Sequence, residues 1–93
     1  MNNLDQTIYQ IEQLLSHGGG SSQWFAQAFL SWLSHDTPYL VNLSGIDRLD
    51  SANLELFTTM LRIRRDQQLN ESERQKLIAL ADYARQRFGL AAN

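Results

Sequence analysis

Residues 21–33 read SSQWFAQAFLSWL, and this stretch predicts the centre of the fold. Its apolar side chains recur at helical spacing and cover about 240° of the circumference, at 100° per residue. The polar residues Gln23, Gln27 and Ser31 occupy only a narrow strip. A helix of this kind must be covered on more than one side, so we expect a central helix over residues 22–35.

Apolar residues recur at helical spacing on both sides of this stretch. The chain of 93 residues is short enough for one domain, 1–93. The predicted fold class is therefore all-α, a compact four-helix domain with an irregular crossover at residues 37–49, in which Pro38 prevents the second helix from continuing. We expect its helices over residues 3–16, 22–35, 51–68 and 71–88.

Helix boundaries are marked by residues that satisfy free backbone groups. Asn70, followed three residues later by Glu73, resembles a capping box, and Gly89 is an expected helix stop. The other predicted boundary residues are Gly18 after the first helix, Ser21 or Ser22 before the second, and Asp50 or Ser51 before the third.

Composition excludes several classes of protein. Hydrophobic residues make up 43% of the chain and charged residues 19%, as in ordinary globular proteins. Cysteine is absent, which excludes disulfides and thiolate chemistry. The N-terminal residues do not resemble a secretory signal, and no apolar run approaches the roughly 20 residues of a membrane span. We therefore expect a cytoplasmic protein without a membrane partner.

The sequence HGGGSS at residues 17–22 is the most conspicuous motif. It lacks the lysine and the preceding strand of a phosphate-binding loop, so it indicates a turn between antiparallel helices. His17 and His35 have no second histidine at ligand spacing, and the neighbouring Asp36 does not by itself make a catalytic triad. We predict no catalytic residue, no cofactor, no metal and no small-molecule substrate, and hence a protein that is not an enzyme.

Basic residues are confined to the second half of the chain, from Arg48 onward. This asymmetry suggests an alternative function as a nucleic-acid-associated regulator, for which the candidate residues are Arg62, Arg65, Arg74 and Lys76. However, acidic residues are interleaved with the arginines, and the isoelectric point is about 5.5. Oppositely charged residues one helical turn apart, such as Arg62 and Asp66, can pair within the helix. This pattern favours an ordinary solvated surface over a nucleic-acid-binding one.

The segment 51–68 carries apolar residues on two nearly opposite faces. One face holds Leu54, Phe57 and Leu61, and the other holds Leu56, Met60 and Ile63. Two interpretations of the second stripe are open. Either the crossover covers it with Leu43, Ile46 and Leu49, or it docks a partner.

The function that we predict follows the second interpretation. It is a non-enzymatic protein–protein interaction or accessory module, whose partner is another protein or a second copy in a homodimer. The expected partner-binding residues are Leu56, Met60 and Ile63, with Arg62 and Arg64 at the rim.

The stretches GGSSQWFAQAFLSWL at 19–33 and LVNLSGIDRLD at 40–50 resemble a small uncharacterised bacterial all-helical family. Its members carry a G-x-S turn, an A-x-FLxxW helix and an aliphatic stretch closing on Leu-Asp. This chain has Trp32 alone where the family commonly shows two tryptophans, and Gln23 and Trp24 where it has arginines. The resemblance implies a compact helical protein and no particular activity.

Overall fold

The computed structural model describes residues 3–17, 20–34, 39, 41–66 and 69–90, and over these residues the chain is helical with no strand. The predicted all-α class is confirmed. The elements in chain order are α1 (Asn3–His17), α2 (Gly20–Leu33), the 3₁₀ helix η1 (Leu43–Arg48), α3 (Ser51–Asp66) and α4 (Glu71–Phe88).

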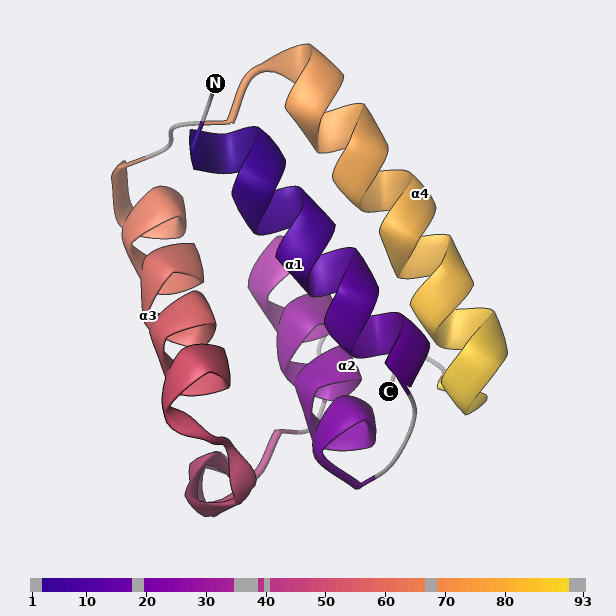
Figure 1. Cartoon of the computed structure of the whole chain (residues 1–93). Coiled ribbons are helices and arrows are strands. Elements are labelled where there is room, and N and C mark those ends of the chain that lie inside the picture. Colours follow the sequence, from indigo (N-terminus) through magenta and orange to yellow (C-terminus); the bar gives the residue numbers. More distant parts are fainter. Residues whose placement is uncertain (1–2, 18–19, 35–38, 40, 67–68, 91–93) are drawn as a thin grey trace.

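The helices are arranged around a pair formed by α1 and α2 (Figure 1). The two helices pack against each other, α3 lies on one side of the pair and α4 on the other. Both α1 and α2 contact α3, and both contact α4. The outer helices therefore depend on the central pair for their positions.

As expected, α2 is the most buried helix. Phe25, Ala26 and Phe29 are completely inaccessible to solvent, and the ring of Phe29 stacks on that of Trp32 at 6.0 Å between centroids. Side chains of α1, α3 and α4 complete the same cluster. The wide apolar arc of residues 21–33 is thus buried against several neighbours.

Two tryptophans of α2 donate hydrogen bonds to backbone carbonyls of the crossover and of α3. The Trp24 Nε1 donates to the carbonyl oxygen of Asn42 at 2.7 Å, and the Trp32 Nε1 donates to that of Met60 at 2.6 Å. The Trp24 ring also meets the ring of Phe57 edge to face at 5.6 Å. A buried indole N–H needs such a partner, so the two bonds help fix the crossover and α3 relative to α2.

Helix ends agree with most of the predicted boundaries. Asn70 and Glu73 form a full capping box, in which each side chain bonds the other residue's backbone N–H. The Asp50 carboxylate accepts from the N–H of Asn53 at 2.8 Å, and Gly89 ends α4 with a φ of 64°. The predicted stop at Gly18 lies outside the described residues.

The predicted start of α2 is wrong by two residues. The helix begins at Gly20, so Ser21 and Ser22 lie inside its first turn and do not cap it. The Ser22 hydroxyl donates instead to the carbonyl oxygen of Leu14 at 2.8 Å, in the buried contact with α1. At the other end α2 stops at Leu33, and the predicted residue 35 lies outside the described part of the chain.

Candidate functional site

The stripe of Leu56, Met60 and Ile63 is not a docking surface. The three side chains are 6%, 0% and 5% exposed within a single chain. Because α3 packs on both α1 and α2, the stripe is turned into the common core. The prediction that these residues bind a partner is therefore wrong, and α3 exposes the opposite side.

The alternative interpretation, in which the crossover covers this stripe, is only partly right. Ile46 and Leu49 pack against the core, but Leu43 is 67% exposed. The cover comes mainly from α1 and α2, both of which pack on α3. Leu43 is thus left at the surface.

Three exposed leucines lie on α3 and on the crossover, and we call them the outer leucine surface. They are Leu43 at 67%, Leu54 at 41% and Leu61 at 49% exposure. Leu54 and Leu61 are seven residues apart, so they lie two turns from each other on one face of α3. The sequence showed two apolar faces on this helix. Burial placed the whole stripe of Leu56, Met60 and Ile63 in the core together with Phe57 of the first face, and left Leu54 and Leu61 exposed.

An open groove of about 240 Å³ lies beside this surface, between α2, the crossover and α3. Leu43 and Leu61 line it, together with Trp32 and Phe57. The last two are almost completely buried and give the groove an apolar base. Such a groove can accept an aliphatic side chain of a partner.

The predicted rim arginines are separated by the turn of the helix. Arg64 lines the groove and is partly buried, whereas Arg62 is exposed on the other flank of the outer leucine surface. Asp66 pairs with Arg65 at 2.9 Å rather than with Arg62, and this hydrogen bond lowers the pKa of the Asp66 carboxyl. Among the described residues Arg62 therefore forms no ion pair.

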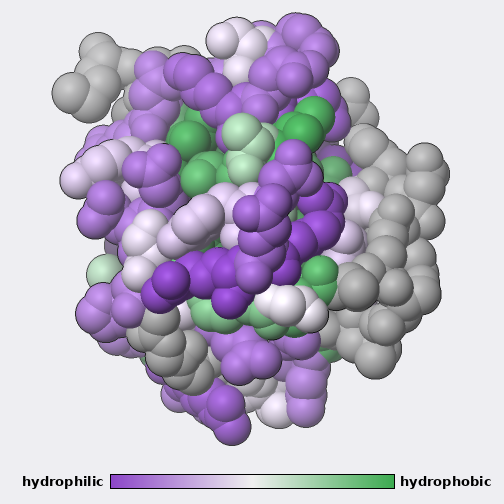
Figure 2. Space-filling model, turned by 90° about the vertical axis from the view of Figure 1, so that its right-hand side faces the viewer, coloured by the Kyte–Doolittle hydropathy of each residue, from purple (hydrophilic) through white to green (hydrophobic). Residues whose placement is uncertain are grey.

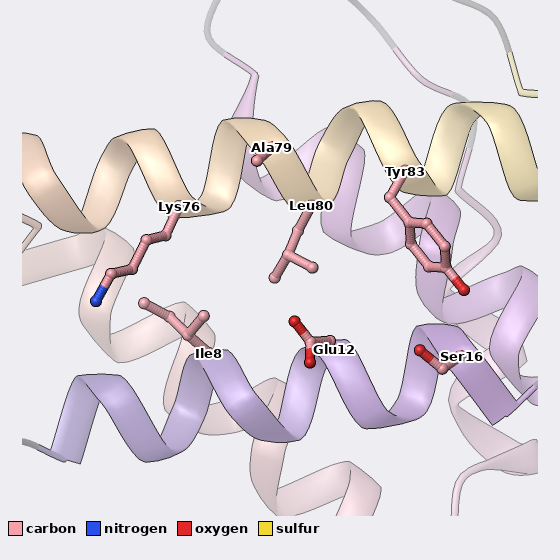
Figure 3. A pocket seen from close by; sticks show the side chains of 7 residues that line it. All are labelled: Ile8, Glu12, Ser16, Lys76, Ala79, Leu80 and Tyr83. Atoms are coloured by element: carbon pink, nitrogen blue, oxygen red, sulfur yellow. The ribbon is translucent and has the colours of Figure 1, made fainter.

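A second groove, of about 490 Å³, lies between α1 and α4 (Figure 3). Its apolar lining comes from Ile8 of α1 and from Ala79 and Leu80 of α4. The side chains of Glu12 and Tyr83 point into the space between the two helices. Neither residue is among the predicted site residues.

A periodic signal could have located this second groove. Ile8, Glu12 and Ser16 are spaced by four residues along the border of the buried face of α1. At one end of the groove the Lys76 ammonium approaches the Asp5 carboxylate at 3.6 Å. A ligand here would have to displace water from charged side chains. This displacement costs free energy unless the ligand offers each charged group a new partner.

The side of the molecule on which α4 lies is mainly hydrophilic. Figure 2 shows hydrophilic side chains over most of this face, with smaller hydrophobic patches between them. Ile78, at 41% exposure, is a large hydrophobic residue of α4 exposed to the same degree as Leu54. It provides a comparison for the outer leucine surface.

The four basic residues of the alternative function lie on two helices. Arg62 and Arg65 belong to α3, Arg74 and Lys76 to α4, and α1 runs between these helices (Figure 1). Arg65 and Lys76 are each paired with a carboxylate. The helix pair α3 and α4 thus lacks the direct packing of a helix-turn-helix, and binding of nucleic acid stays a prediction.

Some classes of site find no support in the described part of the chain. Its histidine, aspartate and glutamate residues form no group of three or more that could hold a metal ion. His35 and Asp36 lie outside the described residues. None of the helices there has both the length and the apolar character needed to cross a bilayer.

Comparison of the chain with protein-family models, with characterised proteins and with solved structures found no match in any of the three. The resemblance to a small bacterial family therefore stays a prediction.

Proposed function

We propose that the chain is a compact four-helix module, without enzymatic activity, that binds another protein chain through the outer leucine surface. The observation that carries the proposal is the exposure of Leu43 and Leu61, which line one groove with an apolar base, together with the exposed Leu54 two turns from Leu61 on the same face of α3. Burying such side chains against a partner releases free energy in proportion to the apolar area removed from water.

The arrangement is that of a helix-binding or helix-presenting surface. The floor of Trp32 and Phe57 is held by packing and by the Trp32 hydrogen bond to Met60, so it does not need to reorganise on binding. Leu61 lines this groove, and about half of its surface is exposed to solvent. Aliphatic anchors around a rigid aromatic base are typical of helix-in-groove recognition.

The groove between α1 and α4 supports binding of a protein chain less well. Its lining includes Glu12 and the paired Lys76, whose water shells a partner would have to replace. The groove beside the outer leucine surface has one charged lining residue, Arg64, whose side chain is already partly buried. We therefore assign the docking function to α3 and the crossover.

Site-specific photo-crosslinking in cells that make the protein tests this proposal. A photoreactive phenylalanine analogue is placed at position 61 in one variant and at position 78 in a second. Leu61 and Ile78 are both exposed hydrophobic residues, on α3 and on α4, so the second variant is a matched control.

We expect a defined crosslinked product from position 61 and none from position 78. The mass of the product distinguishes a second copy from a different protein. Equal crosslinking at both positions, or none at position 61, would contradict docking at the outer leucine surface.

A further inference from the structure

The charges beside the outer leucine surface are arranged so that the surface complements itself. Glu55 and Arg62 are exposed and lie seven residues apart on α3, each directly after a leucine of the surface. At 100° per residue both lie on the same flank of the stripe that contains Leu54 and Leu61. Among the described residues, neither takes part in an ion pair.

A two-fold axis near Thr58 would bring these opposite charges together. In an antiparallel pair of α3 helices, a residue three or four positions before the axis in one copy faces a residue three or four positions after the axis in the other copy. Leu54 then meets Leu61 of the second copy, and Glu55 meets Arg62 of the second copy. Each contact occurs twice, as in an isologous interface.

Thr58 is suited to the centre of such an interface. Its hydroxyl donates to the carbonyl oxygen of Leu54 at 2.9 Å within the same helix. The hydroxyl would therefore not lose its hydrogen bond when a second copy covers it. The side chain is also small enough for two helices to approach each other.

We infer that the partner of the outer leucine surface is a second copy of this chain, bound through antiparallel α3 helices. This inference rests on the proposed docking function and adds the identity of the partner. Leu54 and Leu61 on both sides of the central Thr58 form the apolar part of the interface. Two Glu55–Arg62 pairs along one edge set the antiparallel orientation, as flanking charges do in coiled coils. With one helix face per copy, the dissociation constant is expected to be on the order of 10–100 µM.

Charge reversal tests the orientation and the partner together. In Glu55→Arg each edge pair consists of two arginines, and in Arg62→Glu each edge pair consists of two glutamates. Sedimentation equilibrium from about 5 µM to 1 mM should show dimerisation weakened about tenfold or more in each variant. Glu12→Arg on α1 changes the net charge as Glu55→Arg does and should leave the dimer unchanged.

Two further samples separate this effect from misfolding. The double variant Glu55→Arg/Arg62→Glu restores opposite charges, so it should dimerise like the natural chain. An equal mixture of the two single variants should form a heterodimer, because the introduced arginine then faces the introduced glutamate and the two unchanged residues face each other. Circular dichroism checks that each variant keeps its helices.

Either of two results overturns the inference. One is a natural chain that stays monomeric at 1 mM, and the other is a dimer that both single reversals leave unchanged. A monomer that still crosslinks from position 61 to a different protein would leave the docking function standing. Loss of crosslinking at position 61 would remove the docking function as well.

Discussion

At Gly45, the absence of a side chain is required by the tryptophan above it. A Cβ atom at this position would lie 2.1 Å from both Cδ1 and Nε1 of Trp24. The indole cannot easily move away, because its N–H is bonded to Asn42 and its ring packs on Phe57.

We expect Gly45→Ala to lower the free energy of unfolding by about 1–3 kcal/mol, the usual cost of forcing an extra carbon into a packed site. Urea unfolding followed by circular dichroism and by tryptophan fluorescence measures the change. Asp47 lies in the same 3₁₀ helix and is exposed, so Asp47→Ala is the control. It should alter the free energy of unfolding by no more than about 0.5 kcal/mol. Equal stability of the two variants would show that the crossover can move away from Trp24.

At the scale of the element, the rotation of α3 about its axis decides which residues can bind a partner. Met60 and Leu61 are adjacent in sequence, but the first is completely buried and the second is 49% exposed. A rotation by half a turn would exchange the two apolar faces. The Trp32 bond to the Met60 carbonyl and the contact of Trp24 with Phe57 help hold the observed orientation.

Two neighbouring substitutions should therefore have opposite effects. Met60→Glu places a carboxylate in the core and should cost about 3 kcal/mol or more, a large part of a small domain's stability. Leu61→Glu should leave the fold within about 1 kcal/mol of the natural chain and abolish dimerisation. Urea unfolding measures the change in stability, and sedimentation measures dimerisation. A Met60→Glu variant that is stable and monomeric would show that the docking face is the stripe of Leu56, Met60 and Ile63.

At the scale of the whole molecule, apolar packing holds the helices together and charges contribute little. The ion pairs between described residues, Arg65–Asp66, Lys76–Asp5 and Arg85–Asp82, all lie at the surface. Polar contacts also link distant parts of the chain, since Arg85 donates to the hydroxyl of Tyr39 at 3.1 Å and Arg87 to the carbonyl oxygen of Ser16. The bond to Tyr39 raises the pKa of Arg85, which stays charged.

We expect the thermal midpoint of the monomer to change by less than about 5 °C between 0.05 M and 0.5 M NaCl, because exposed ion pairs contribute little and are screened by salt. Calorimetry at a protein concentration below the dissociation constant of the dimer measures the thermal midpoint, with Leu61→Glu as a monomeric control. Dimerisation itself should weaken with salt, because its edge pairs are exposed. A large loss of monomer stability in salt would mean that charges support the fold.

The sequence by itself determined the all-α class, the position of α2 at the centre and the helix ends at Asn70 and Gly89. These features depend on local chemistry: the spacing of apolar residues, the hydrogen-bonding side chain of a cap and the conformational freedom of glycine. Only the tertiary structure decided that Leu54 and Leu61 stay exposed while the other large apolar residues of α3 enter the core, and only it brought Glu12 and Tyr83 to one groove. Helical spacing places Leu56 and Leu61 on different faces but cannot say which face meets the core, because that depends on the shapes of α1 and α2 together.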